Sequence, residues 1–322
     1  MLQVKPIAMR DALLRRIEGQ MAEDHTIFFV TADFGSPVLD DIRSKYPDRF
    51  VNVGVAEQNL INVSAGLALE GYKVFAYAIA PFITMRCFEQ ISVNLCLLSQ
   101  VRPINVNLIG VGAGYSYVVS GPTHQCYEDI SIMRTLPVIR ILSPSDHLTS
   151  AALFDACDES GIRYIRLDAQ ILPCIAEFDD HDFNAGFRVL SKSSDEICFI
   201  STGYMTHTTK KIIDHYATIG KKIIHIDLFD ITNFNRDNLL AIIKESKLIV
   251  TLEEGFGGRG GIDSIFQEIV RYDLPEAKFL SIAVSPKYSF EIGNREELHN
   301  LVGIGFEASI KKIDPVLKSI GM

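Results

Sequence analysis

The sequence predicts an α/β protein with two doubly wound domains, and three observations lead to that prediction. Short apolar runs of strand length alternate with segments of helical periodicity through the first half of the chain. A polar stretch at 191–196 interrupts this alternation, and the same alternation resumes after it. Strands that alternate with helices imply mostly parallel sheets with helices on both faces. We place the boundary within 176–192 and divide the chain into residues 1–185 and 186–322.

The elements of the first half are predicted from periodicity. Residues 9–21 alternate apolar and charged side chains at helical spacing, and 26–31 is an apolar run that ends in a loop at 32–35. Such a run is typical of a buried parallel strand. Asp146 is predicted to cap the helix that follows it. Further strands are expected at 50–55, 74–78, 104–109 and 139–142, helices at 60–69 and 81–98, and a glycine-rich loop at 110–120.

The second half repeats the pattern. Strands are expected at 197–201, 223–227 and 248–252, and the glycine-rich run 253–261 then precedes a helix. A glycine-rich loop between strand and helix can cradle phosphate, but this run lacks the Lys-Ser/Thr pair of a P-loop. We therefore do not expect a nucleotide there.

Composition excludes several classes of protein. The chain has 322 residues, 48% hydrophobic and 22% charged, as soluble globular domains have, and its net charge of −9 argues against nucleic-acid binding. No apolar run reaches the roughly 20 residues of a membrane span, and the first residues lack the apolar segment of a signal peptide. The six cysteines show no CxxC spacing. We expect a cytoplasmic protein with reduced thiols that binds neither nucleic acid nor membrane.

Three short motifs carry the functional information. Residues 54–59 read Gly-Val-Ala-Glu-Gln-Asn, which puts Glu57 between a predicted strand and a predicted helix. Ligands of α/β proteins bind at the carboxyl ends of strands, although a glutamate there also stabilises a helix N-terminus through the macrodipole. The stretch 82–91 reads Phe-Ile-Thr-Met-Arg-Cys-Phe-Glu-Gln-Ile, and 121–125 reads Gly-Pro-Thr-His-Gln.

Together these motifs resemble the pyrimidine-binding domain of transketolases, most closely the separate C-terminal subunit of split transketolases. The resemblance covers nearly the whole chain, in order. It implies a pyrimidine-binding domain over 1–185 and a transketolase C-terminal domain over 186–322, in which 253–261 is mainly structural. Deoxyxylulose-phosphate synthase and the β subunits of 2-oxoacid dehydrogenases share this fold, but Gly-Pro-Thr-His-Gln favours transketolase.

The resemblance also implies roles in binding thiamine diphosphate, the cofactor that carries the difficult chemistry. Glu57 matches the glutamate that hydrogen-bonds the cofactor's pyrimidine and helps to remove the reacting proton, so we expect it to be buried. Phe82 matches the aromatic residue that stacks on the pyrimidine, although a phenylalanine in an apolar stretch is more often an ordinary core residue. Arg86 and Glu89 are expected to pair on one helix face.

Other matched positions concern the substrate. His124 matches an active-site histidine that hydrogen-bonds sugar oxygens and can transfer protons near neutral pH, and Gln125 lies beside it. Ser120 stands where many transketolases have an aspartate that contacts a sugar hydroxyl. Arg10 aligns with an arginine that binds the sugar phosphate; the alternative is a solvated helix residue. Asp33 aligns with an aspartate near the cofactor and the subunit contact; the alternative is a loop-forming aspartate.

Departures from the family pattern point to an unusual substrate. Gly112 replaces a histidine of other transketolases. Split members usually read Tyr-x-Arg-Leu-Gly-Arg where this chain has 164–169, so Ala169 replaces a phosphate-binding arginine. Each charged hydrogen bond lost costs about 1.5–3 kcal/mol. We expect a modified sugar, such as an unphosphorylated or nucleotide-linked one, with Tyr115 and Tyr117 facing it.

The family binds the diphosphate and its Mg²⁺ through a Gly-Asp-Gly motif, which this sequence does not contain. We therefore expect a separate N-terminal subunit to supply that motif and the metal, so that the pair transfers a two-carbon ketol unit between sugars. Self-association through the pyrimidine domains would give a heterotetramer. A synthase that decarboxylates a 2-oxoacid and a non-catalytic scaffold are the alternatives. The presence of Glu57, Phe82 and His124 argues against the scaffold.

Overall fold

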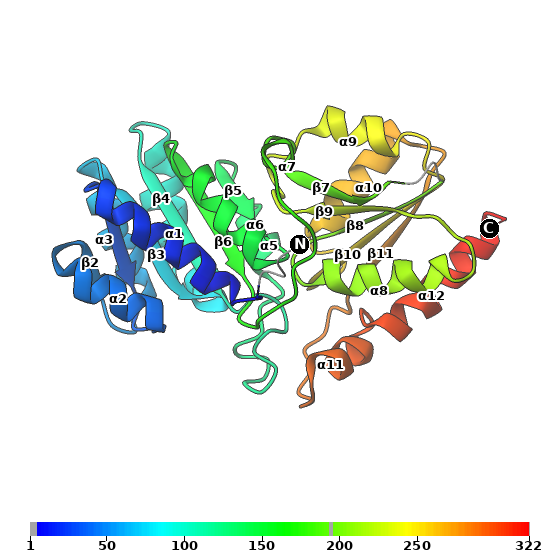
Figure 1. Ribbon diagram of the computed structural model, residues 1–322, viewed down its shortest axis with the longest axis horizontal. Coiled ribbons are helices and arrows are strands. Elements are labelled where there is room, and N and C mark those ends of the chain that lie inside the picture. Colours follow the sequence, from blue (N-terminus) through cyan, green and yellow to red (C-terminus); the bar gives the residue numbers. More distant parts are fainter. Residues whose placement is uncertain (1–4, 193–195, 322) are drawn as a thin grey trace. The chain divides into compact units, whose positions relative to one another are not determined.

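The computed structural model describes residues 5–192 and 196–321, which form two compact units (Figure 1). Among the described residues, the N-terminal unit comprises 5–113 and 132–174, and the C-terminal unit comprises 114–131, 175–192 and 196–321. The segment 114–131 therefore packs with the C-terminal unit, although the chain on both sides of it belongs to the N-terminal unit. The division into residues 1–185 and 186–322 stays a prediction.

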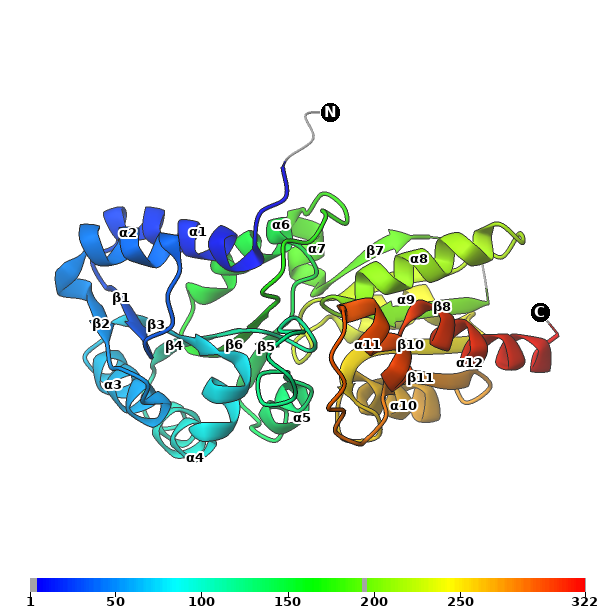
Figure 2. The ribbon, with the colours of Figure 1, turned by 90° about the horizontal axis from the view of Figure 1, so that it is seen from below.

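The N-terminal unit contains a six-stranded sheet of order β2-β1-β3-β4-β6-β5 in which all pairings are parallel. The central strands β3 and β4 are almost entirely buried, as expected for a parallel sheet covered on both faces. Figure 2 shows α1 and α2 on one face and α3 and α4 on the other. The strands are β1 (Ile27–Thr31), β2 (Phe50–Asn52), β3 (Lys73–Ile79), β4 (Asn105–Val111), β5 (Ile139–Leu142) and β6 (Gly161–Leu167).

The helices of this unit begin where the sequence supplies caps. Ser36 accepts a hydrogen bond from the backbone N of Leu39 at the start of α2, with Pro37 as the first helical residue. Asp146 accepts from the backbone N of Thr149 at 2.8 Å, which confirms the predicted cap. The helices are α1 (Met9–Glu23), α2 (Pro37–Lys45), α3 (Glu57–Leu69), α4 (Phe88–Gln90) and α6 (His147–Ala152), with 3₁₀ turns η1 (Pro47–Arg49) and η4 (Leu153–Cys157).

The predicted regular helix at 81–98 is wrong in detail. Two π-helical segments, η2 (Phe82–Arg86) and η3 (Ile91–Leu97), flank the short α4. The hydroxyl of Thr84 donates to the carbonyl of Ala80 at 2.7 Å, within the first of them. A π segment inserts a residue into the helical turn and is frequent at functional sites. The hydrophobic pattern of the sequence does not distinguish it from an α-helix.

The C-terminal unit contains a five-stranded mixed sheet of order β11-β10-β8-β9-β7, in which β7 is antiparallel to β9. Figure 1 shows α9 and α10 on one face of this sheet and α8 and α12 on the other. The strands are β7 (Phe187–Ser191), β8 (Ile197–Ser201), β9 (Ile224–Leu228), β10 (Leu248–Phe256) and β11 (Lys278–Val284). The helices are α7 (Asp180–Ala185), α8 (Met205–Ala217), α9 (Arg236–Ile243), α10 (Ile262–Asp273), α11 (Arg295–Val302) and α12 (Phe306–Ser319), and α5 (Asp129–Met133) spans the change between units.

Strand β10 is longer than predicted, because it continues through Glu253 and Glu254 to Phe256. Both carboxylates are buried and accept hydrogen bonds from other parts of the chain. Acidic residues followed by glycines suggest a loop when the sequence is considered alone. Hydrogen-bond donors from distant parts of the chain, which the sequence does not reveal, keep this segment extended.

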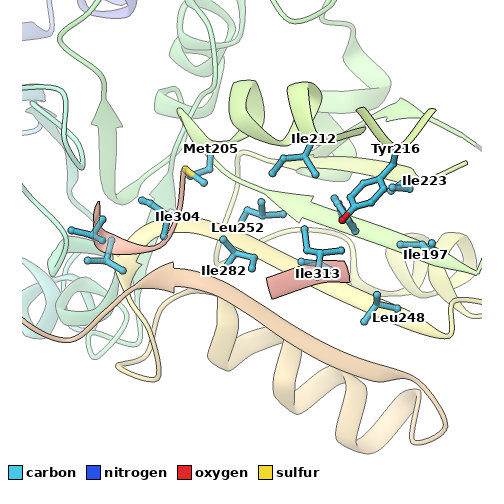
Figure 3. Packing of buried hydrophobic residues seen from close by; sticks show 14 of the residues in the cluster. Ile197, Met205, Ile212, Tyr216, Ile223, Leu248, Leu252, Ile282, Ile304 and Ile313 are labelled. Atoms are coloured by element: carbon cyan, nitrogen blue, oxygen red, sulfur yellow. The ribbon is translucent and has the colours of Figure 1, made fainter. Parts of the chain in front are cut away.

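The core of the C-terminal unit lies between the sheet and the helices α8 and α12. Figure 3 shows Ile212 and Tyr216 of α8 and Ile313 of α12 packed over strand residues such as Leu252 and Leu248. Tyr115 and Tyr127 of the segment 114–131 belong to the same buried cluster. That segment is thus anchored in the C-terminal core.

Two negative findings concern the described parts of the chain. No helix among residues 5–192 and 196–321 is long and apolar enough to cross a membrane. All six cysteines lie within these ranges, and no disulfide joins them.

The buried His225, on β9 of the C-terminal unit, predicts that the stability of the protein depends on pH. Burial, together with the positive charges of Lys210, Arg188 and His207, lowers the pKa of His225 to about 3. Below its ordinary value of 6.5 the unfolded chain gains a proton that the folded protein does not bind until the pH approaches 3. The free energy of unfolding should therefore fall by up to about 1.4 kcal/mol per pH unit on acidification through this window.

Urea unfolding at about pH 7 and about pH 5, monitored by hydrogen exchange of the backbone amides of β9, measures this slope. His225→Gln should flatten it, while the exposed His181→Gln should leave it unchanged. Equal slopes in wild type and His225→Gln would show that His225 is not the group responsible.

Candidate active site

Glu57 lies at the junction of β2 and α3 in the N-terminal unit. The backbone N of Val53 donates to the carbonyl of Thr31, and Gly54 then turns the chain with φ +75°, a conformation that favours glycine. Glu57 is the first residue of α3 and is only 5% exposed. The expectation that it is buried is confirmed.

A cation connects Glu57 to Phe82. Nη1 of Arg86 lies 2.9 Å from Oε1 of Glu57, and the guanidinium carbon lies 3.6 Å from the centre of the Phe82 ring. The carbonyl of Arg86 accepts from Nε2 of Gln58 at 3.2 Å. The predicted pair of Arg86 with Glu89 is wrong, because η2 directs Arg86 back toward α3. The sequence does contain a signal for the stacking of Arg86 on Phe82, because the two residues lie four positions apart in a helical segment.

The Gly-Pro-Thr-His-Gln motif lies in a closed loop of the C-terminal unit. Gly114 and Cys126 exchange two backbone hydrogen bonds of 2.9 Å, which close the excursion 115–125 at its base. Within it, the backbone N of His124 and that of Gln125 both donate to the carbonyl of Gly121. The motif is therefore a compact turn on a fixed base.

The side chains of this loop differ in exposure. His124 is half-buried, with Nδ1 2.9 Å from the hydroxyl oxygen of Thr123. Gln125 is 2% exposed, and its Oε1 accepts from the hydroxyl of Tyr127 at 2.7 Å. Ser120 is exposed. His124 and Ser120 are thus the accessible side chains of this loop, while Gln125 is buried and bonded to Tyr127.

The prediction that Tyr115 faces a sugar is wrong. Tyr115 is 1% exposed, with its ring 5.1 Å from that of Tyr127 and 5.4 Å from that of His299. Its side chain fills the C-terminal core, which a tyrosine in a glycine-rich loop does not indicate. Tyr117 is half-buried, and its contact with a sugar stays a prediction.

Arg10 and Asp33 lie in the N-terminal unit. Arg10, on α1, is partly buried and its Nε donates to the carboxylate of Asp11 at 2.8 Å, so it is not a fully solvated helix residue. Asp33 follows β1 with φ +55° and exchanges two hydrogen bonds with the side chain of Asn52. A non-glycine residue in this conformation is strained, and such strain is concentrated at functional sites.

Asp33 and Asn52 line a hollow of ≈ 180 Å³ beside the carboxyl ends of β1 and β2. No hydrogen bond among the described residues joins Arg10 or Asp33 to Glu57. The N-terminal unit therefore groups Glu57, Arg86 and Phe82, while Arg10 and Asp33 are separate features of it.

The segment 164–169 has no cationic group at its end. β6 ends at Leu167, the buried Asp168 accepts from the backbone N of Gln170 at 2.8 Å, and the half-buried Ala169 lies between them. The acidic side chain is occupied in shaping the turn after the strand.

Comparison with known proteins connects these features to a family. The pyrimidine-binding domain of transketolase matches residues 5–173, and the transketolase C-terminal domain matches residues 187–308. A protein from Actinobacillus succinogenes, named as one of the subunits of an apulose-4-phosphate transketolase, is 32% identical over 70% of this chain and 71% of its own length. The protein of the same name from Phocaeicola vulgatus is 31% identical over 80% of this chain and 82% of its own.

A solved structure described as a split gene transketolase, inactive beta4 tetramer, superimposes with a TM-score of 0.82. The two sequences are 25% identical, and the match covers 98% of this chain and 99% of the other. The two domain matches, the identity to both relatives and this superposition agree with one another. The chain belongs to the transketolase family and contains matches to its pyrimidine-binding and C-terminal domains.

Proposed function

We propose that this chain is the C-terminal subunit of a two-component, thiamine-diphosphate-dependent transketolase-like enzyme, which transfers a two-carbon ketol unit between sugars. The observation that carries the proposal is the arrangement of Glu57, Arg86 and Phe82. It combines a buried carboxylate with an aromatic face at a strand-to-helix junction, where α/β proteins bind ligands.

The geometry of Arg86 tests whether these residues fit the cofactor. Its guanidinium is a planar group that stacks on Phe82 at 3.6 Å and directs an N–H toward Glu57 at 2.9 Å. These atoms stand in for a protonated aminopyrimidine, which is also planar and also presents N–H donors at its edge. The donor set and the spacing therefore fit the pyrimidine of thiamine diphosphate.

The chain's own residues have distinct roles in this proposal. Thiamine diphosphate, when bound, supplies the carbon nucleophile. Glu57 would hold the pyrimidine by a hydrogen bond and move a proton at its carboxylate, and Phe82 would fix the plane of the ring. His124 hydrogen-bonds sugar oxygens near neutral pH, with Ser120 and Gln125 beside it.

Two further residues belong to the proposal from the family pattern. Arg10 binds an anionic group of the sugar, as a partly buried guanidinium in a helix is able to do. Asp33 lies near the cofactor and the subunit contact, in agreement with its strained backbone.

The substrate that we propose is a sugar other than xylulose 5-phosphate and ribose 5-phosphate. Gly112, Ser120 and Ala169 each replace a polar or charged residue that other transketolases direct at the sugar or its phosphate. Two relatives, about one third identical, are named for apulose 4-phosphate, a non-standard sugar phosphate. A modified sugar is consistent with both observations.

The partner that we propose is an N-terminal subunit with a Gly-Asp-Gly motif, which binds Mg²⁺ and the diphosphate. The motif is absent from this sequence, and the relatives are named as subunits. Magnesium is typically held by one or two carboxylates together with phosphate oxygens. A cytoplasmic heterotetramer built through the pyrimidine domains completes the proposal.

Calorimetric titration of thiamine diphosphate with magnesium tests this proposal. We expect binding when this chain is mixed with the Gly-Asp-Gly subunit and none when either chain is alone, because the pyrimidine and diphosphate sites lie on different polypeptides. Donor-dependent turnover should appear in the same mixture. Absence of binding in the mixture would favour the scaffold alternative. Release of carbon dioxide from a 2-oxoacid, without ketol transfer, would favour the synthase, which the change at Ser120 leaves open.

A further inference from the structure

Glu254, near the end of strand β10, has a buried carboxylate that accepts hydrogen bonds from four donor atoms. It is 2% exposed and accepts from Nε and Nη2 of Arg295 at 3.0 and 2.8 Å and from Nε2 of His299 at 2.7 Å. The fourth donor is the backbone N of Tyr115 at 3.2 Å. That donor belongs to the loop that carries the Gly-Pro-Thr-His-Gln motif.

Neighbouring cationic groups stabilise the ionised form of Glu254. Burial alone would raise the pKa of this carboxyl, but Arg295 and His299 outweigh burial and hold the pKa well below its usual range. The guanidinium of Arg295 is itself stacked 3.5 Å from the centre of the Tyr204 ring. Glu254 is therefore ionised near neutral pH, and charge-assisted hydrogen bonds of this kind are the stronger ones.

The base of the loop is fitted around this carboxylate. Gly114 has φ +54°, and a Cβ at that position would lie 2.2 Å from Oε2 of Glu254. Only glycine allows the backbone to approach so closely without distortion. Because Gly114 also pairs with Cys126, the carboxylate sits directly against the point where the loop closes.

The same strand holds the other end of the loop two residues later. The backbone N of Phe256 donates to the carbonyl of Tyr127 at 3.3 Å, and the two rings lie 4.9 Å apart. Tyr127 in turn donates its hydroxyl to Gln125 at 2.7 Å. Glu254 therefore contacts the loop near Tyr115 and Phe256 contacts it near Tyr127, so the end of β10 holds both ends of the loop.

The neighbouring Glu253 holds a different element. Its carboxylate accepts from the backbone N of Ile262 at 3.1 Å and from that of Asp263 at 2.9 Å, at the start of α10. It is as deeply buried as Glu254, but both of these donors belong to α10 and neither belongs to the loop 114–126. Glu253 therefore provides a matched control for the effect of changing a buried carboxylate on β10.

We propose that Glu254 is a positioning residue for the transfer reaction, which fixes the loop 114–126 so that His124 and Gln125 are preorganised to receive the sugar. This inference rests on the proposed function. It assigns to the C-terminal domain a part in the reaction that does not involve the cofactor's pyrimidine, whose ligands Glu57 and Phe82 lie in the other unit. Small displacements of such groups cost up to about 100-fold in rate.

Glu254→Gln and Glu253→Gln, each assembled with the partner subunit, test the inference through three measurements. For Glu254→Gln we expect faster hydrogen exchange in 114–126 and a kcat/KM for the sugar that is lower by about 10- to 100-fold. The Kd for thiamine diphosphate should stay within about twofold. Glu253→Gln should speed exchange at the start of α10 and leave the loop and kcat/KM nearly unchanged.

Glu254→Asp provides the second variant, because it keeps the charge beside Arg295 but withdraws the carboxylate from Tyr115. Its loop exchange and kcat/KM should fall between those of wild type and Glu254→Gln. Equal losses of activity in Glu253→Gln and Glu254→Gln, or unchanged loop exchange in Glu254→Gln, would overturn the inference. A wild-type assembly that neither binds thiamine diphosphate nor turns over would instead refute the proposed function, while the exchange measurement would still decide whether Glu254 holds the loop.

Discussion

Replacing Glu57 by glutamine is expected to lower turnover of the assembled enzyme by about 10³-fold, within the range that proton transfer contributes to catalysis. Glutamine has nearly the same size and keeps a hydrogen-bond acceptor, but it cannot exchange a proton with the pyrimidine. Glu57→Ala should reduce turnover at least as much, because it also removes the hydrogen bond. Steady-state assays with donor sugar, thiamine diphosphate and magnesium measure the loss.

The fold should tolerate this change. Glu57 pairs with Arg86, whose side chain is 47% exposed, and such half-exposed pairs contribute less than about 1 kcal/mol. The exposed Glu89, in the neighbouring α4, provides a matched control. Glu89→Gln should retain activity within about twofold. Near-normal turnover by Glu57→Gln would remove Glu57 from the mechanism and with it the central argument for the site.

Replacing His124 by alanine is expected to lower kcat/KM for the sugar by about 10²-fold and to leave the Kd for thiamine diphosphate unchanged. The imidazole is half-buried on a closed loop and oriented by Thr123, so its loss removes a preorganised hydrogen bond to the sugar. Contributions of about this size are usual for a positioned acid–base or hydrogen-bonding group. Isothermal titration and initial-rate kinetics separate the two effects.

His124→Asn should recover part of the loss, because the amide keeps a hydrogen-bonding group at that position. The exposed His181 serves as control, and His181→Ala should be indistinguishable from wild type. Parallel loss of sugar and cofactor affinity in His124→Ala would mean that the histidine maintains the loop's structure and has no direct contact with substrate.

Much of the N-terminal sheet is predictable because its information is local. The apolar runs that form β1, β3 and β4 are buried on both faces. A parallel strand in that position consists almost entirely of apolar side chains, which the sequence shows directly. The caps at Ser36 and Asp146 are short-range features as well. The position of Glu57 follows from a strand-to-helix junction that is visible in six residues of sequence.

What the sequence did not predict depends on distant partners. The pairing of Arg86 with Glu57 follows from the π-helical turn, whose extra residue leaves no signature in hydrophobic periodicity. The burial of Tyr115 and the extension of β10 depend on contacts between distant segments, such as the hydrogen bond that joins Tyr115 to Glu254 across 139 positions. A pattern within a window of ten to twenty residues cannot contain such a contact.

That separation also has a consequence for synthesis of the chain. At about 5–20 residues per second, Glu254 is translated about 7–28 s after Tyr115, and Arg295 and His299 follow later still. During this interval β10 is incomplete, so Tyr115 and Tyr127 cannot yet enter the finished core of the C-terminal unit. We therefore expect the segment that carries His124 to be among the last to fold. A ribosome-bound chain that ends before α11 should expose this segment to proteases and chaperones.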